Sequence, residues 1–280
     1  MRFLGIGDNV VDVYVDRNVM YPGGNTLNFC AYAKKLGYDV GYIGVFGSDP
    51  PAKHVWSVAQ SLGIDLSRCR QYTGENGCAK VNLTNGERIF VGSNKGGVSK
   101  EHSIHLDEED LKYIKNFDLV HTSCFSYLEP ELKKLNKIGI PVSYDFSTHL
   151  DPATLSEVCP HLFLAVGSCS HLSDNEIYAL GKDMHRFGSQ MALLSMGRRG
   201  AVLYDGVTFF HQDAGKEKAI DSMGAGDSFL TAFLTTYLSS RASSVSHEMA
   251  VRDALQKAAN FATEICMVAG AFGYGTEYRS

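Results

Sequence analysis

The part of this sequence with the strongest chemical character runs from Asp221 to Phe229 and reads Asp-Ser-Met-Gly-Ala-Gly-Asp-Ser-Phe. Its glycines, Gly224 and Gly226, allow a tight turn and a close approach of the backbone to a ligand. The apolar run Phe229–Leu238 follows and predicts a helix. The first N–H groups and the positive dipole end of such a helix favour a bound anion, most often a phosphate.

Asp227 lies where that helix is predicted to begin, so its carboxylate could accept a proton from an attacking hydroxyl. The backbone of Gly224, Ala225 and Gly226 would then form an anion hole that neutralises a migrating phosphoryl group. The alternative is that Asp227 only caps its helix. The whole string is more demanding than a cap requires and favours phosphoryl transfer.

A second polar segment, Gly23-Gly24-Asn25-Thr26-Leu27-Asn28, precedes the first long predicted helix. Gly23 and Gly24 would permit close approach to a sugar, and the amides of Asn25 and Asn28 can both donate and accept hydrogen bonds. An ordinary glycine turn with Asn25 as a helix cap is the alternative.

Two carboxylates, Asp8 and Asp12, follow the first predicted strand. A dinucleotide-binding turn is excluded, because G-x-G-x-x-G would require glycine at Val10. Carboxylates beyond the carboxyl end of a parallel strand are well placed for a polyol substrate. Turn carboxylates in solvent are the alternative.

Strand-like and helix-like segments alternate along the chain, which predicts one α/β domain over residues 1–280, a mainly parallel sheet covered by helices on both faces. The expected helices include Asn25–Leu36 and Pro51–Leu62. The expected strands are Phe3–Gly7, Val40–Phe46, Phe117–Thr122, Ile140–Phe146, Leu162–Gly167, Met191–Met196, Ala201–Tyr204 and Val207–Phe210.

One stretch interrupts this rhythm, because Lys80–Thr84 and Glu87–Val91 flank Asn85-Gly86, a strong signal for a two-residue hairpin turn. Val10–Val15 and Val19–Met20 could add strands to the same element. We expect a small antiparallel sheet from residues 10–22 and 70–95 that serves as a lid. A surface hairpin without function is the alternative.

The composition limits the class of protein. With 44% hydrophobic and 20% charged residues the chain is typical of globular proteins, and its formal charge of −5 disfavours nucleic acid as a partner. Seven cysteines without a C-x-x-C pair indicate a reducing compartment. The start of the chain runs directly into a strand-like segment, and no apolar run approaches the ~20 residues of a membrane span. We therefore expect a cytoplasmic protein that does not contact a membrane.

These strings resemble the ribokinase-like carbohydrate kinases, whose signatures are D-T-x-G-A-G-D, here with Ser222 for Thr, and G-G-N-x-x-N. The resemblance implies a three-layer α/β/α fold, ATP as phosphoryl donor, Asp227 as base and sugar contacts from Asp12 and Asp8. It also implies that lids of this kind pair two subunits, so we expect a homodimer.

On the nucleotide side the resemblance is carried by Ser195-Met196-Gly197-Arg198-Arg199-Gly200, which is similar to the family's T-x-G-x-x-G strand end. It implies that Ser195, Gly197 and Gly200 lie near the ATP phosphates and ribose. Asn260 matches a residue beside the adenine. A plain turn and a plain helix residue are the respective alternatives.

The metal-binding part of the family pattern departs here, because Ser168-Cys169-Ser170-His171 stands where many relatives carry N-x-x-E. Asn175-Glu176 lies nearby, but Ser173 and Glu176 have the spacing of a helix capping box. Mg²⁺ is still expected, since ATP phosphoryl transfer requires charge neutralisation; its protein ligands are not predicted, and K⁺ is a further candidate. His102 and His105 are interpreted as surface histidines.

Within the family, Ile6–Tyr14, Gly23–Asn25, Tyr144–Ser147 and the C-terminal signature resemble bacterial fructoselysine 6-kinases. This implies phosphorylation of the 6-hydroxyl of a fructosyl-lysine, whose far end could meet Arg88 or Lys95. Ribose, fructose, other fructosamines, nucleosides and keto-deoxy sugar acids remain open as substrates, and so does a non-catalytic sugar-binding regulator.

Overall fold

The computed structural model describes residues 1–84, 87–217 and 219–278, without the side chains of residues 87 and 88. The predicted Asn85-Gly86 turn and the side chain of Arg88 therefore lie outside the described residues.

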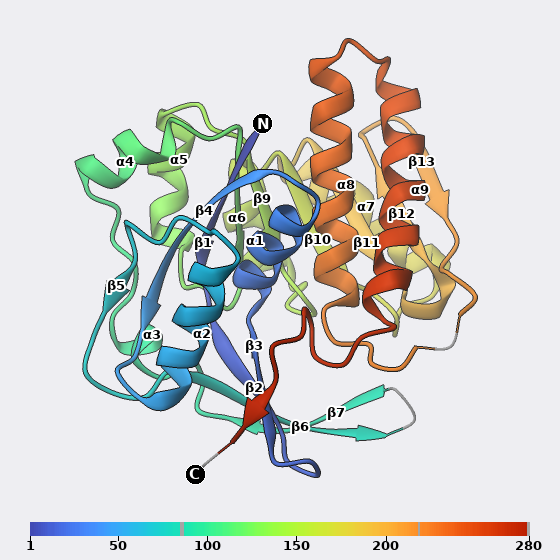
Figure 1. Cartoon of the computed structure of the whole chain (residues 1–280). Helices are drawn as coiled ribbons and strands as arrows, with labels where there is room; N and C mark the ends of the chain where they lie inside the picture. Colours follow the sequence, from blue (N-terminus) through green and yellow to red (C-terminus); the bar gives the residue numbers. More distant parts are fainter. Residues whose placement is uncertain (85–86, 218, 279–280) are drawn as a thin grey trace.

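A large sheet forms the centre of the described molecule (Figure 1). All neighbouring strands from β11 to β5 run parallel, and only the β11–β12 and β12–β13 pairs are antiparallel. In spatial order its strands are β13 (Phe209–Gln212), β12 (Ala201–Tyr204), β11 (Met191–Ser195), β10 (Leu164–Ser168), β9 (Val142–Asp145), β8 (Leu119–Ser123), β1 (Arg2–Gly7), β4 (Asp39–Phe46) and β5 (Arg70–Gln71).

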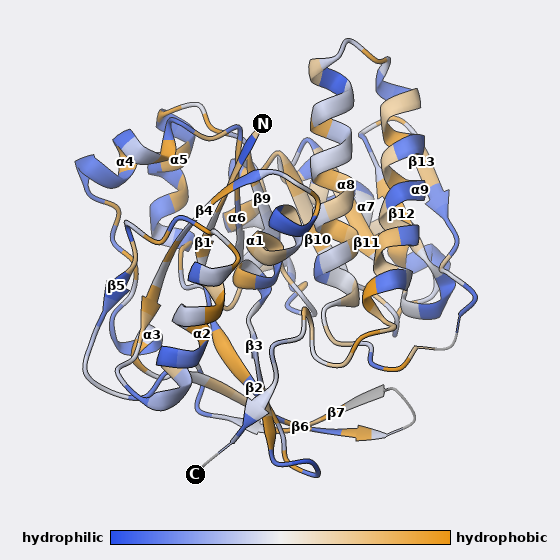
Figure 2. Cartoon of the chain, in the orientation of Figure 1, coloured by the Kyte–Doolittle hydropathy of each residue, from blue (hydrophilic) through white to orange (hydrophobic). Residues whose placement is uncertain are grey.

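Helices cover both faces of this sheet, because its central strands are apolar on both sides. The helices that contribute side chains to one core cluster are α1 (Asn25–Lys35), α2 (Pro50–Ser61), α8 (Ala225–Ala242) and α9 (His247–Ile265). Those that contribute to the other are α3 (Val98–Glu101), α4 (Glu108–Ile114), α5 (Leu132–Lys137), α6 (Pro152–Val158) and α7 (Asp174–Arg186). Apolar residues follow the sheet strands and the helix faces turned toward them (Figure 2). The predicted three-layer α/β/α fold is confirmed.

A smaller sheet directly follows the carboxyl end of β1 (Figure 1). Its order is β14 (Thr276–Glu277), β3 (Val19–Gly23), β2 (Val10–Tyr14), β6 (Gly77–Thr84) and β7 (Glu87–Ser93). Two features differ from the expected antiparallel sheet of residues 10–22 and 70–95. The β2–β6 pair is parallel, and residues 70–71 form β5, which pairs with β4 in the large sheet. The late strand β14 joins the small sheet instead.

Side-chain hydrogen bonds explain where some element boundaries differ from the sequence pattern. The expected strand Val207–Phe210 begins only at Phe209, because the carboxylate of Asp205 accepts hydrogen bonds from the backbone N–H groups of Val207 and Thr208 and forms a turn. Helix α7 begins with the predicted capping box, in which Ser173 and Glu176 satisfy each other's backbone N–H groups.

Candidate active site

Asp227 lies in the first turn of α8 and is held by two amide side chains from α1. Nδ2 of Asn25 donates to one carboxylate oxygen at 2.8 Å, and Nδ2 of Asn28 donates to the other at 2.6 Å. Asn28 is 3% exposed, and its Oδ1 has no hydrogen-bond partner within the described part of the chain. The two predicted motifs therefore meet at one carboxylate, beside a buried acceptor that still lacks a donor.

Helix α1 can begin where it does because of Gly24 and Asp8. Gly24 has φ 107°, a region that favours glycine, and a Cβ there would lie 2.8 Å from the Cα of Asn9. Oδ2 of Asp8 accepts the backbone N–H of Asn25 at 2.7 Å. Asn25 is thus the first residue of the helix and not its cap, since the side chain of Asp8, directly after β1, accepts the free N–H at the helix start.

The Asp8 carboxylate faces donors of the protein itself. It is 6% exposed, and its Oδ1 accepts from hydroxyl groups of α1, of the last residue of β8 and of the segment after β8. These hydroxyls belong to Thr26 (2.8 Å), Ser123 (2.9 Å) and Ser126 (3.1 Å). Its geometry is that of an anchor for α1.

Asp12 lies on β2 and is 4% exposed. A Cβ on Gly23 would collide with the Asp12 carboxylate, so glycine at this position makes room for that carboxylate beside the start of α1. The structure therefore brings Asp12, Gly23 and Gly24 together with the amides of Asn25 and Asn28.

The predicted anion hole forms the start of α8. Gly224 has φ 73°, the left-handed region, and a Cβ there would collide with the hydroxyl of Tyr32. At Gly226, by contrast, a Cβ would meet nothing within 4 Å. The first turn thus borders open space at Gly226, while the backbone N–H of Ala225 donates to the carbonyl of Ser222 at 3.3 Å. A phosphate site at this helix start remains a prediction.

Asp221 holds this turn in place, a role that the sequence motif does not reveal. The residue is fully buried. Its carboxylate accepts from the hydroxyl of Tyr14 at 2.6 Å, from the N–H of Met223 at 2.9 Å and from the N–H of Gly270 at 2.9 Å. Because Tyr14 belongs to β2, this carboxylate ties the anion turn to the small sheet.

Two further polar residues join the site, and motif analysis assigned neither of them a role. Oδ2 of Asp145, at the end of β9, accepts from Nδ2 of Asn25 at 2.8 Å, and Nε2 of His121 on β8 lies 2.9 Å from Oδ1 of Asn25. Asp145 belongs to the segment Tyr144–Ser147, which carries part of the family resemblance. His121 lies inside an apolar strand, and no motif in the sequence around it predicts a functional role.

Burial controls the protonation of both residues. It raises the pKa of Asp145 to about 6, and the negative charge of Asp8 adds to this, while hydrogen bonds from Ser147 and Asn25 act in the opposite direction. It lowers the pKa of His121 to about 3, so the imidazole is neutral near pH 7.

The residues predicted to bind the nucleotide lie at the end of β11, at the turn that follows it and on the nearby helix α9. Ser195 ends β11, and Gly197 and Gly200, with φ 60° and 90°, bound the short 3-10 helix η3 (Gly197–Arg199). A Cβ on Gly200 would lie 2.9 Å from the backbone nitrogen of Ala214. A Cβ on the next residue, Gly215, would collide with the side chain of Thr263 on α9, so residues 214 and 215 lie beside both this turn and α9.

Asn260 lies on that same helix, one turn before Thr263. Its side chain is exposed and accepts a hydrogen bond from Gln256 at 3.1 Å. An adenine contact from this residue remains a prediction.

No group of three or more His, Cys, Asp or Glu side chains is placed to hold a metal ion within the described ranges. Glu176 is engaged in its capping box, and His102 stacks on Tyr72 with ring centroids 3.8 Å apart.

All seven cysteines are free thiols, and no described helix is long and apolar enough to cross a membrane.

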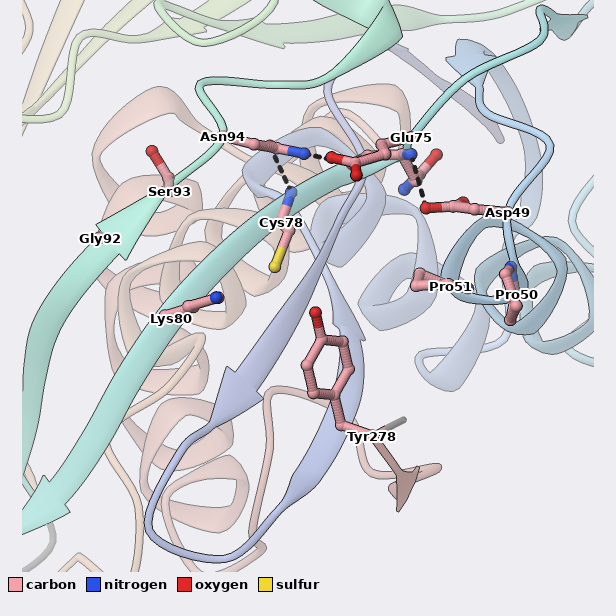
Figure 3. Close-up of a pocket in the computed structure, with 11 residues that line it drawn as sticks. Asp49, Pro50, Pro51, Glu75, Cys78, Lys80, Gly92, Ser93, Asn94 and Tyr278 are labelled. Atoms are coloured by element: carbon pink, nitrogen blue, oxygen red, sulfur yellow. Dashed lines mark hydrogen bonds between the residues drawn. The ribbon is translucent and has the colours of Figure 1, made fainter. Parts of the chain in front are cut away.

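A separate hollow of about 560 Å³ lies beside the small sheet and the start of α2 (Figure 3). Lys80 and Tyr278 point toward it from β6 and from the segment after β14, and Asp49 and Glu75 border it. It shares no lining residue with the site around Asp227.

Comparison with known proteins first defines the class. Ribokinase from Giardia lamblia superposes with a TM-score of 0.81 at 16% identity, covering 97% of this chain and 94% of that one. Aminoimidazole riboside kinase from Salmonella enterica superposes with a TM-score of 0.77 at 19% identity, covering 100% of this chain and 97% of that one. The chain therefore has the ribokinase-like fold, as predicted.

Sequence comparison then identifies the family. The pattern of the pfkB family carbohydrate kinases matches residues 3–137 and 164–273. Fructosamine kinase FrlD of Bacillus subtilis is 41% identical over 280 residues, covering 100% of this chain and 95% of that protein. Fructoselysine 6-kinase of Escherichia coli is 30% identical over 229 residues, covering 82% and 86%. This chain belongs to the pfkB family and is an ATP-dependent carbohydrate kinase.

Proposed function

We propose that this kinase transfers the γ-phosphoryl group of ATP to the 6-hydroxyl of a fructosamine, with fructoselysine as its substrate. The choice of substrate is supported by the 41% identity to a fructosamine kinase over the whole chain. The chemistry is supported by one observation above all: Asp227 is held by two amides at the N-terminal turn of α8, beside open space at Gly226.

In this mechanism Asp227 accepts the proton of the attacking hydroxyl while the hydroxyl oxygen forms a bond to the γ-phosphorus. The bond from that phosphorus to the β–γ bridging oxygen breaks, and ADP leaves. The N–H groups at Gly224, Ala225 and Gly226 stabilise the charge on the equatorial phosphoryl oxygens.

The sugar is proposed to lie against Asp12, Gly23, Gly24 and Asn28. Oδ1 of Asn28 is buried without a donor, and a sugar hydroxyl is the kind of donor that would satisfy it. Asp8 takes a positioning role instead of a direct contact, because its oxygens already accept from α1 and from a hydroxyl at the end of β8. Lys95 is exposed and remains a candidate for the far end of the substrate.

For the nucleotide we propose Ser195, Gly197 and Gly200 near the phosphates and Asn260 near the adenine. Mg²⁺ would neutralise phosphate charge during transfer. Asp145 fits such a cation, since no ion pair is found for its buried carboxylate among the described residues. Water and phosphate oxygens would complete the shell, and a monovalent ion such as K⁺ is a further candidate cofactor.

We also propose that the small sheet is a lid over this site within a single domain, and that the enzyme works in the cytoplasm, where ATP and free thiols are both maintained.

The substrate is tested by measuring ADP release with fructoselysine, other fructosamines, fructose, ribose and a nucleoside, followed by NMR of the product. We expect the highest kcat/KM for fructoselysine, with phosphate on O6. A higher kcat/KM for fructose, ribose or a nucleoside would assign the enzyme to another branch of the family.

The base is tested with Asp227→Asn. Removing a general base is expected to lower kcat by about 10²- to 10⁴-fold, while ATP binding measured by calorimetry stays nearly unchanged. Turnover close to that of the wild type would remove Asp227 from the mechanism. If the wild type turned over none of these sugars, that result would favour the alternative of a non-catalytic sugar-binding regulator.

A further inference from the structure

The imidazole of His121 is a buried polar group that the mechanism above does not use. It is 0% exposed on β8 and packs against the ring of Phe29, with centroids 4.6 Å apart. Each ring nitrogen has one partner: Nδ1 lies 2.8 Å from Oγ of Ser143, and Nε2 lies 2.9 Å from Oδ1 of Asn25.

The direction of every hydrogen bond in this group follows from the two carboxylates. Nδ2 of Asn25 lies 2.8 Å from an oxygen of Asp145 and 2.8 Å from an oxygen of Asp227, and ionised carboxylates only accept. That atom must therefore be the NH₂ group, and the atom that faces His121 is the carbonyl. Nε2 of His121 then carries the hydrogen, and Nδ1 accepts from the hydroxyl of Ser143.

The neutral state of His121 is what this arrangement needs. A neutral imidazole has one donor and one acceptor, and burial keeps His121 neutral by lowering its pKa to about 3. Ser143 is also fully buried, and its hydroxyl, which can donate or accept, supplies the partner for Nδ1 once the carbonyl of Asn25 has placed the proton on Nε2.

The amide of Asn25 needs such a partner, because rotation about its last side-chain bond is soft. A half-turn would point the carbonyl oxygen at both carboxylates and remove the hydrogen bond to Asp227. The N–H of His121 opposes this rotation, since it would then face an NH₂ group.

We infer that His121 is a positioning residue of this kinase: through the amide of Asn25 it holds the Asp227 carboxylate in the orientation in which it accepts the substrate proton. The inference rests on the proposed role of Asp227. It assigns a function to a residue that does not itself touch the substrate.

The test is the His121→Phe variant, which keeps a flat ring but has no donor. We expect kcat to fall by about 10- to 100-fold, as for other residues that orient a functional side chain, with KM for ATP within about twofold of the wild type. We also expect the acid limb of the pH profile of kcat/KM to move to higher pH, because Asp227 loses a hydrogen bond that favours its ionised form.

Other ionisable groups lie around His121, Asn25 and Asp227, and all of them are still present in His121→Phe. The shift of the acid limb is therefore measured as the difference between this variant and the wild type. They are Asp145 on β9, Asp8 after β1, Tyr32 on α1, Asp12 on β2, Asp221 before α8 and Cys266 at the end of α9.

Two controls separate positioning from packing. His121→Gln restores an N–H donor and is expected to recover part of kcat and to return the acid limb toward its wild-type position. Thr122→Val, at the next position of β8, removes a buried hydroxyl that has no hydrogen-bond partner among the described residues, and should leave kcat unchanged.

A double variant gives the sharpest readout. In an Asn25→Ala background, His121→Phe is expected to lower kcat no further, because both changes break the same connection to Asp227. Wild-type kcat in His121→Phe, an unmoved acid limb, or independent losses in the double variant would each overturn the inference. An active Asp227→Asn would instead overturn the proposed function, so the two failures are distinguishable.

Discussion

At the scale of single residues, the site is unusual in how its carboxylates are held. Asp8 accepts from a helix start and from hydroxyls, Asp221 accepts from a turn and a tyrosine, and Asp227 accepts from two amides. The donors in these hydrogen bonds are neutral backbone, hydroxyl and amide groups. The region is therefore suited to binding a neutral polyol or a cationic amine.

Asp145 is the exception, because burial dominates its environment and raises its pKa from 3.8 to about 6. A carboxyl with a raised pKa contributes stability that is fully present below pH 3.8 and is lost as the pH rises through about 6. We expect Asp145→Asn to gain stability relative to the wild type over this range, on the order of 1 to 3 kcal/mol.

The measurement is the free energy of unfolding by urea at several pH values between 4 and 8, for the wild type and the variant. His121 contributes in the opposite direction, since its lowered pKa costs stability as the pH falls below 6.5. That contribution is present in both proteins and cancels in their difference. A difference that does not change with pH would show that Asp145 does not titrate as proposed.

At the scale of elements, the start of α8 combines a tight turn with a ligand site, and its two glycines serve different purposes. Gly224 adopts a left-handed conformation against Tyr32, whereas Gly226 lies inside the helix beneath open space. The first glycine is thus required by the fold, whereas the fold leaves the second free, and we propose that the bound phosphate requires it.

Paired alanine substitutions test this division. Gly224→Ala places a Cβ against the Tyr32 hydroxyl in a strained conformation and should destabilise the protein by about 1 to 3 kcal/mol. Gly226→Ala should leave stability unchanged or raise it by about 0.5 to 1 kcal/mol, because alanine favours a helix. Its Cβ would nevertheless occupy the proposed phosphate site, so we expect a higher KM for ATP and a lower kcat.

Thermal unfolding and steady-state kinetics of both variants are the measurements. A normal KM for ATP in Gly226→Ala would show that the space above this turn is not where the phosphate binds.

At the scale of the whole molecule, the small sheet exposes an apolar edge. Strand β7 is one of its two edge strands, and Ile89, Phe90 and Val91 are 53%, 65% and 54% exposed. An edge strand with exposed apolar side chains favours association with another chain. We propose that this edge contributes to a homodimer.

Light scattering after size-exclusion chromatography is expected to give a dimer for the wild type and a monomer for the Phe90→Glu, Val91→Lys double variant. Val207 is 87% exposed on the β12–β13 hairpin, at the far edge of the large sheet, and Val207→Glu is the control that should remain dimeric. If the wild type were a monomer at micromolar concentration, the proposed homodimer would be wrong.

The sequence alone determined the fold class and the position of the glycine turn before α8, because these depend on local patterns. Apolar strands, helix signals and the glycines around Asp227 are each encoded within about ten residues, and an alternating series of such elements has few ways to pack. The expected strand Ala201–Tyr204 and the capping box at Ser173 agree with the structure for this reason.

Only the tertiary structure decided which polar groups meet. His121, Asn25 and Asp227 are far apart in the chain, and β5 and β14 are too short to show a pattern, so their pairing depends on the register of packed elements. A buried polar group must find a partner wherever the fold provides one. The choice of partner, and with it the role of His121, is therefore a property of the folded molecule.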